Sequence, residues 1–183
     1  EKIGAGEQAG AWGTTTNNNL DILDRAINGV GAITLSGTTH TLTTSDGTLS
    51  DGGYKVLVLG GSPSGTNTIT ISPNDQDKMY FVHNNSGQTA TFTQGSGANV
   101  SVPTGSKALI FADGAGSGAA VTDLLDGLAY GGTKVTSTAT ELNLMDGGTS
   151  AGTTAVAAGD GIVTNDGGTM RQTTAATFST YFN

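Results

Sequence analysis

The chain has 183 residues and a formal net charge of −8, and its seven Lys and Arg are scattered along the sequence. Nucleic-acid binding requires a clustered basic surface, so this distribution argues against a nucleic-acid partner. The absence of cysteine excludes disulfides and thiolate metal sites.

The composition predicts a β-rich protein with a small apolar core. The chain has 30 glycines and three prolines, with 12% charged and 35% hydrophobic residues. Such low charge is unlike a disordered chain, whereas threonine suits strands and glycine suits tight turns. We expect either small folded pieces or copies of the chain that share a core. No apolar run approaches the about 18 residues of a membrane span, so we expect no membrane insertion.

The first predicted element is a helix over residues 17–28, NNNLDILDRAIN. Its apolar stripe, spaced by three and four residues, consists of Leu20, Leu23, Ile27 and Val30. Thr16 or Asn17 is the expected N-cap, and Gly29 is the expected stop. A helix of this length needs tertiary packing to persist.

The only tryptophan, Trp12, precedes this helix in the glycine-rich stretch GEQAGAWG, which we expect to be a loop. We expect the ring to pack against the Leu20, Leu23 and Ile27 face or against an adjacent subunit. Residues 1–30 are therefore predicted to be an attachment or docking segment.

Residues 31–122 are predicted to form a small antiparallel β-sandwich or barrel of about eight strands. The expected strands are 32–35, 40–44, 54–59, 68–72, 78–84, 89–93, 100–102 and 108–112. Glycine-rich and Asx-rich turns separate them. The runs YKVLVL and ALIF lack polar alternation, which favours fuller burial of these two strands.

Residues 123–183 are predicted to be a Gly/Thr-rich connector, a short trimerising helix and the start of a fibre shaft. Thr138 with Glu141 forms a capping box, and Gly147 is a helix stop. One face of this short helix carries Ala139, Leu142 and Met145, which three copies could bury together. Beyond it, we expect a strand over 161–164 with a turn at NDGG, and a last helical turn that buries Phe178, Tyr181 and Phe182.

The polar residues do not form a recognisable catalytic or metal-binding pattern. His40 and His83 lack a third ligand at metal spacing, and SPNDQD is better explained as a turn than as a cation loop. No phosphate-binding loop is found in the sequence. We therefore expect no catalytic, cofactor-binding or metal site, and no enzyme.

Two segments carry a resemblance to a known family. GEQAGAWGTTTNNNLDILDRAI resembles the entry segment of tail-fibre-like structural proteins of marine tailed bacteriophages, and VTSTATELNLMDGGTS resembles the TAxELNxMDG fibre motif. The first match covers Gly6, Glu7, Ala9, Gly10, Trp12, Gly13, Thr14, Thr16, Asn17, Asn19, Leu20, Asp21 and Ala26. The second covers Val135, Thr138, Ala139, Glu141, Leu142, Asn143, Asp146 and Gly147. The β-rich middle is similar in type over 79–84, 89–93, 100–105 and 109–114.

The resemblance implies a homotrimeric structural protein of the virion, made in the host cytoplasm. It would be a tail fibre or fibre-like adaptor that links the tail to a distal fibre involved in host adsorption. The implied partners are itself, other phage tail or baseplate proteins and, through the parent fibre, a host surface receptor. The interaction residues expected for docking or trimerisation are Trp12, Leu20, Leu23, Ile27, Ala139, Leu142 and Met145.

Two other functions are also weighed against the sequence. A carbohydrate-binding or adhesin-type β module of bacterial origin fits a small sandwich equally well. A depolymerising tailspike enzyme would need a long β-helix with paired carboxylates, and the irregular repeats disfavour it.

Overall fold

The computed structural model describes residues 4–127, 129–143 and 152–182. The chain divides into two compact units, Glu1–Lys134 and Val135–Asn183, which are described separately. The elements of the first unit are α1 (Trp12–Asn28), β1 (Val30–Leu35), β2 (Thr39–Thr43), η1 (Asp51–Gly53), β3 (Val56–Gly61), β4 (Asn67–Ser72), β5 (Asp77–Asn84), β6 (Ala90–Thr93), β7 (Val100–Val102), β8 (Lys107–Asp113), η2 (Gly116–Gly118), β9 (Val121–Asp123), β10 (Ala129–Tyr130) and β11 (Thr133–Lys134). Those of the second are α2 (Ala139–Asn143), β12 (Gly161–Asp166), β13 (Thr169–Thr174) and α3 (Ala175–Ser179). The predicted mainly β class with a short N-terminal helix is confirmed.

Helix α1 begins five residues earlier than predicted. The carbonyl of Gln8 accepts hydrogen bonds from the backbone N–H groups of Ala11 and Trp12, which turns the chain into the first helical turn. The Thr15 hydroxyl also donates to Gln8 Oε1 at 2.9 Å. Ala11 occupies the N-cap position and makes no side-chain cap. The predicted caps Thr16 and Asn17 therefore lie inside the helix, and Trp12 is its first residue rather than part of a loop.

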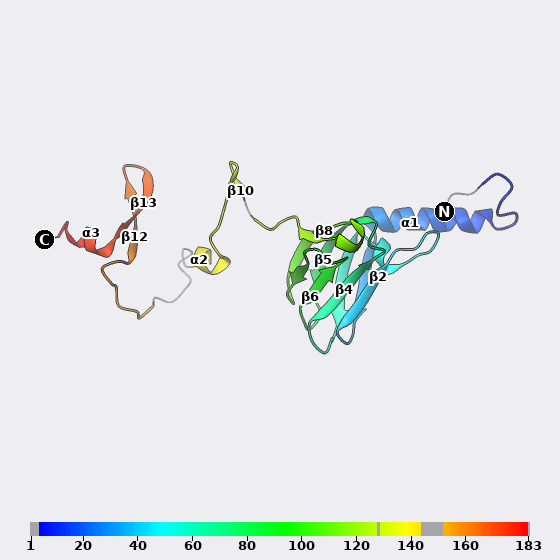
Figure 1. The fold of residues 1–183 in the computed structure, drawn as a ribbon, viewed down its shortest axis with the longest axis horizontal. Helices are drawn as coiled ribbons and strands as arrows, with labels where there is room; N and C mark the ends of the chain where they lie inside the picture. Colours follow the sequence, from blue (N-terminus) through cyan, green and yellow to red (C-terminus); the bar gives the residue numbers. More distant parts are fainter. Residues whose placement is uncertain (1–3, 128, 144–151, 183) are drawn as a thin grey trace. The chain divides into compact units, whose positions relative to one another are not determined.

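The strands β1 to β9 form two stacked sheets, ordered β1-β3-β5-β8-β9 and β2-β4-β6-β7 (Figure 1). The chain alternates between them, so that β1, β3 and β5 run parallel in one sheet while β2, β4 and β6 run parallel in the other. It thus winds through three successive coils, where each coil is one strand of the first sheet followed by one strand of the second. Strands β7, β8 and β9 then add antiparallel edges.

This winding corrects the antiparallel pairing that was expected. Parallel neighbours cannot be joined by a hairpin and need a crossover connection, and here the intervening strand of the opposite sheet is that crossover. Within the described residues, neither sheet closes into a barrel. The expected strand positions nevertheless fall on β1 to β8, with no end displaced by more than two residues.

The core lies between the two sheets and is built from alternate residues of each strand. Its fully buried members include Leu57, Leu59, Ile69, Ile71, Tyr80, Phe92 and Ile110. Burial of each large apolar side chain contributes roughly 1.5–3 kcal/mol relative to exposure. Helix α1 contributes no buried residue to this core.

A buried asparagine closes one of the turns between the sheets. Asn84 ends β5, and its Nδ2 donates to the carbonyls of Gln88 at 2.9 Å and Val102 at 2.8 Å. Its Oδ1 accepts from the Ser86 backbone N–H at 3.0 Å and from the Ser86 hydroxyl at 2.7 Å. A buried amide in which both ends are bonded stabilises the turn that carries the chain across to β6.

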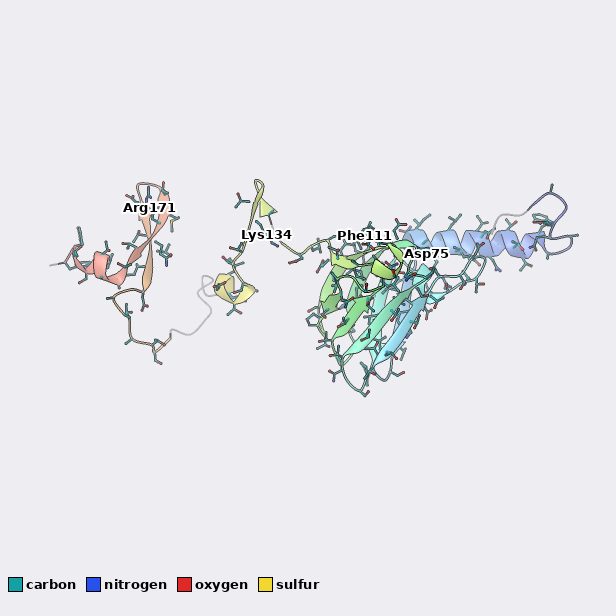
Figure 2. All side chains as sticks on the ribbon, in the orientation of Figure 1. Asp75, Phe111, Lys134 and Arg171 are labelled. Carbon is teal, nitrogen blue, oxygen red and sulfur yellow. The ribbon has the colours of Figure 1, made fainter. Side chains whose placement is uncertain are left out.

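The second unit contains the short helix α2, the hairpin β12–β13 and the helix α3. The predicted turn at NDGG is confirmed, because β12 and β13 pair in an antiparallel register around it. Arg171 on β13, labelled in Figure 2, pairs with Asp166 at 2.8 Å. The expected burial of Phe178, Tyr181 and Phe182 is wrong within the single chain. Their rings touch edge to face, yet all three side chains are exposed.

Candidate functional site

The predicted interaction residues of the N-terminal segment lie on one side of α1. Trp12, Leu20, Leu23 and Ile27 are 65%, 58%, 56% and 65% exposed. At 3.6 residues per turn, their spacing places them on a single stripe along the helix. The ring of Trp12 is therefore not buried against this stripe within its own chain. Packing against an adjacent subunit stays a prediction.

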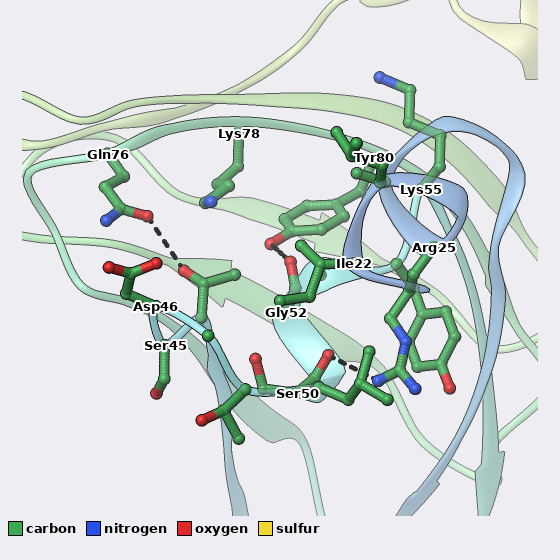
Figure 3. Close-up of a pocket in the computed structure, with 18 of the residues that line it drawn as sticks. Ile22, Arg25, Ser45, Asp46, Ser50, Gly52, Lys55, Gln76, Lys78 and Tyr80 are labelled. Carbon is green, nitrogen blue, oxygen red and sulfur yellow. Dashed lines mark hydrogen bonds between the residues drawn. The ribbon is translucent and has the colours of Figure 1, made fainter. Parts of the chain in front are cut away.

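The opposite side of α1 is fixed to the β unit by Arg25. The Arg25 guanidinium lies over the Tyr54 ring, 4.2 Å from its centre, and Arg25 Nη1 donates to the Ser50 carbonyl at 3.1 Å (Figure 3). Ile22, on the same side of the helix, faces the cleft beside these residues. The helix therefore has one side held by its own chain, and Leu23 is the member of the stripe that also lines this cleft.

Gly29 joins α1 to β1 and ends the helix, as predicted, but not in the left-handed conformation typical of a glycine stop. Its φ of −64° and ψ of 134° are extended. Its N–H donates to the Arg25 carbonyl, and its own carbonyl accepts from Lys55 and Val56. A Cβ here would lie 2.5 Å from the Arg25 carbonyl oxygen. Glycine is therefore required by close approach of the backbone.

A cleft of about 1040 Å³ lies between α1, the loop of residues 44–50 and the start of β5. Figure 3 shows Lys78 pointing into it, with Gln76 and Asp46 nearby. The Thr44 hydroxyl donates to Gln76 Oε1 at 3.1 Å, and partial burial lowers the pKa of Lys78. These groups could hydrogen-bond a polar ligand.

Two further observations on titratable residues, Tyr80 and the two histidines, concern the fold rather than a ligand. The Tyr80 hydroxyl, at the floor of this cleft, donates to the Gly52 carbonyl at 2.8 Å, and burial raises the pKa of Tyr80. His40 on β2 and His83 on β5 lie in different sheets. Within the described residues, no group of three His, Asp or Glu is placed to hold a metal ion.

The predicted capping box of the second helix is confirmed. The Thr138 N–H donates to Glu141 Oε2 at 2.7 Å, and the Glu141 N–H donates to the Thr138 hydroxyl at 3.2 Å. These bonds lower the pKa of Glu141. Ala139 and Leu142 lie on the exposed α2, whereas Met145 and the predicted stop Gly147 lie outside the described residues.

Sequence reasoning missed a second apolar surface, on the outward side of the five-stranded sheet. Its centre is the register row formed by Val30, Val56, Phe81 and Leu109. The signal was present in YKVLVL and ALIF, which are apolar on both sides of the strand. These runs were correctly associated with burial, but one side of each has no cover within the described part of the chain.

Comparisons with protein-family models, with curated proteins and with solved structures gave no match. In the part of the chain that the structure describes, no helix is both long and apolar enough to cross a membrane.

Proposed function

We propose that this chain is a structural protein of a phage virion, a trimeric tail fibre or fibre-like adaptor that links the tail to a distal fibre involved in host adsorption. The observation that carries the proposal is the exposed apolar stripe of α1, formed by Trp12, Leu20, Leu23 and Ile27. An apolar stripe of this kind needs a partner.

The two motifs that resemble phage fibre proteins indicate the kind of partner that the stripe contacts. The stripe of α1 lies within the first motif, and the capped helix α2 lies within the second. We assign the first segment to docking or trimer contacts and the second to the start of the shaft. Host recognition belongs to the parent fibre, beyond these residues.

Electron microscopy of purified phage particles labelled with an antibody to this chain tests the proposal. We expect label on a tail appendage. Label that is absent from particles and present on bacterial cells contradicts the virion role and supports an adhesin.

The second candidate function, a carbohydrate-binding or adhesin-type module, is favoured by the cleft between α1 and the 44–50 loop. Its lining combines hydroxyl, amide and charged groups around Thr44, Gln76 and Lys78, which suit sugar hydroxyls. A glycan array separates the two candidates. Binding that is lost in Lys78→Ala favours the module, and no binding by a folded protein counts against it.

A further inference from the structure

The centre of the outward side of the five-stranded sheet is an apolar surface across β1, β3, β5 and β8. The central row is Val30, Val56, Phe81 and Leu109, and the row beside it contains Met79 and Phe111. Figure 2 labels Phe111 on this sheet. Phe81 is 47% exposed in the single chain. On the other flank, Ala32 pairs with Val58, and the same row continues to His83 and Lys107, so the apolar character ends there on β5 and β8.

The other sheet shows what a water-facing surface looks like in the same molecule. Its outward positions are hydroxyl residues in register, with Thr39 beside Thr68 and Thr68 beside Thr91. The next row places Thr41, Thr70 and Thr93 side by side. A half-solvated sheet alternates apolar and polar residues in this way, whereas a sheet covered on both sides is apolar throughout. The central rows of the five-stranded sheet therefore have the pattern of a sheet that is covered on both sides.

The apolar sheet surface is continuous in the chain with the stripe of α1. Leu20, Leu23, Ile27 and Val30 follow a spacing of three, four and three residues, and Val30 is also the first member of the central sheet row. A three–four spacing of apolar residues is the pattern by which one helix packs along another. The occupant that this pattern fits is a helix with the same stripe, which a copy of this chain provides.

Charge also favours a copy of the chain as the occupant. Each copy carries a net charge of −8, so two copies repel unless their contact surface lacks charge. The rows of Phe81 and Met79 have none, whereas the flanking rows carry His83 and Lys107 on one side and Asp77 and Asp113 on the other.

We infer that the α1 stripe and the outward side of the five-stranded sheet form one contact surface, here called the assembly face, through which three copies of the chain pack around a common axis. This inference rests on the trimer of the proposed function and names the surface that makes it. The helices meet along their stripes, and the sheets meet through Val56, Phe81 and their neighbours.

Sedimentation equilibrium with matched charge substitutions tests the assembly face. The wild-type chain is expected at three times 18.1 kDa. Phe81→Glu places a carboxylate at the centre of the face and is expected to give the single-chain mass with an unchanged far-ultraviolet spectrum. Thr70→Glu makes the same kind of change on the outward side of β4 and is expected to keep the wild-type mass.

Cysteine accessibility supplies a second measurement that does not depend on the stability of Phe81→Glu. The natural chain has no cysteine, so Val58→Cys and Thr70→Cys each introduce a unique thiol on the outward side of an interior strand. At concentrations where the wild type is a trimer, we expect Val58→Cys to react with a bulky maleimide at least tenfold more slowly than Thr70→Cys. Dilution to the single chain should largely remove the difference.

The outcomes separate this inference from the proposed function. A trimer that survives Phe81→Glu, or a Val58→Cys thiol that reacts as fast as Thr70→Cys in the trimer, overturns the assembly face and leaves the virion role standing. A folded wild-type monomer at micromolar concentration overturns both the face and the trimer. Antibody labelling of particles then decides the virion role separately.

Discussion

The guanidinium of Arg25 stacks on the ring of Tyr54, and this contact determines which side of α1 is available to other molecules. Arg25 lies on α1 and Tyr54 directly follows η1, so the pair joins the helix to the β unit across 29 residues of sequence. The hydrogen bond from Arg25 to the Ser50 carbonyl fixes the same side of the helix to the loop before η1.

Replacing Arg25 by alanine is expected to loosen α1 without unfolding the sandwich. A cation–π contact contributes about 0.5–2 kcal/mol. The bond to Ser50 adds about 1 kcal/mol. Hydrogen exchange of the α1 amides should therefore accelerate by roughly tenfold or more, while exchange in β3 and β5 stays unchanged. Arg171→Ala is the matched control, since its pair with Asp166 is exposed and contributes little. Unchanged exchange in α1 would contradict the role given to Arg25.

Two neighbouring glycines are expected to differ sharply in their tolerance of alanine. Gly61 has a φ of +90°, and a Cβ there would lie 2.3 Å from the Leu35 carbonyl oxygen of the adjacent coil. Gly61→Ala should lower the free energy of unfolding by about 1–3 kcal/mol. A Cβ at Gly60 meets nothing within 4 Å, and Gly60→Ala should change it by less than about 0.5 kcal/mol. Urea denaturation measures both, and equal effects would show that the coil contact at Gly61 is not constraining.

Trp12→Ala is expected to weaken self-association while leaving the single chain as stable as before. The Trp12 side chain is mostly exposed, so its removal costs the monomer little. Sedimentation velocity should show dissociation at higher protein concentration than in the wild type, and any glycan affinity should be unchanged. Thr14→Ala, also exposed on α1, is the control. If sugar binding fell while assembly stayed intact, Trp12 would be a ligand contact instead.

The helix α2 is expected to fray in acid through Glu141. The Thr138 N–H and hydroxyl bind the carboxylate and hold the folded-state pKa of Glu141 below its ordinary value of 4.5. The stabilisation is therefore complete above pH 4.5 and is lost as the pH falls through the lower, folded pKa. Amide chemical shifts of residues 139–142 should move toward coil values over this range. Glu141→Gln should abolish the pH dependence; a dependence that persisted would assign it to another group.

The strands could be predicted from the sequence, but their partners could not. Alternation in TNTITIS and TATFTQ identifies which residues of β4 and β6 face inward, because side-chain direction has a period of two. The same alternation is compatible with parallel and antiparallel neighbours. Glycine and Asx residues favour reversals of the chain, which is why antiparallel neighbours are expected from the sequence. Here they carry the chain to the opposite sheet, with Asn84 bonded inside one of them.

For the helix and the interaction residues, too, some features could be predicted from the sequence and others could not. The stripe of Leu20, Leu23 and Ile27 could be read from spacing, and all three are exposed on one side of α1. The start at Trp12 could not, because it depends on the Gln8 carbonyl and not on a capping side chain. The sheet surface around Phe81 could not be located either, since its extent depends on the register of β1, β3, β5 and β8.

The strand order of the five-stranded sheet also determines how the β unit responds to force. Strand β9 runs in the same direction as β1, because β1, β3 and β5 are parallel and two antiparallel steps follow. A pull that enters from α1 at Val30 and leaves after Asp123 therefore acts along the strands in opposite directions at the two edges. All hydrogen bonds of a ladder then bear the load together instead of opening one after another. The unit is arranged to transmit tension, with its hydrogen bonds loaded in shear.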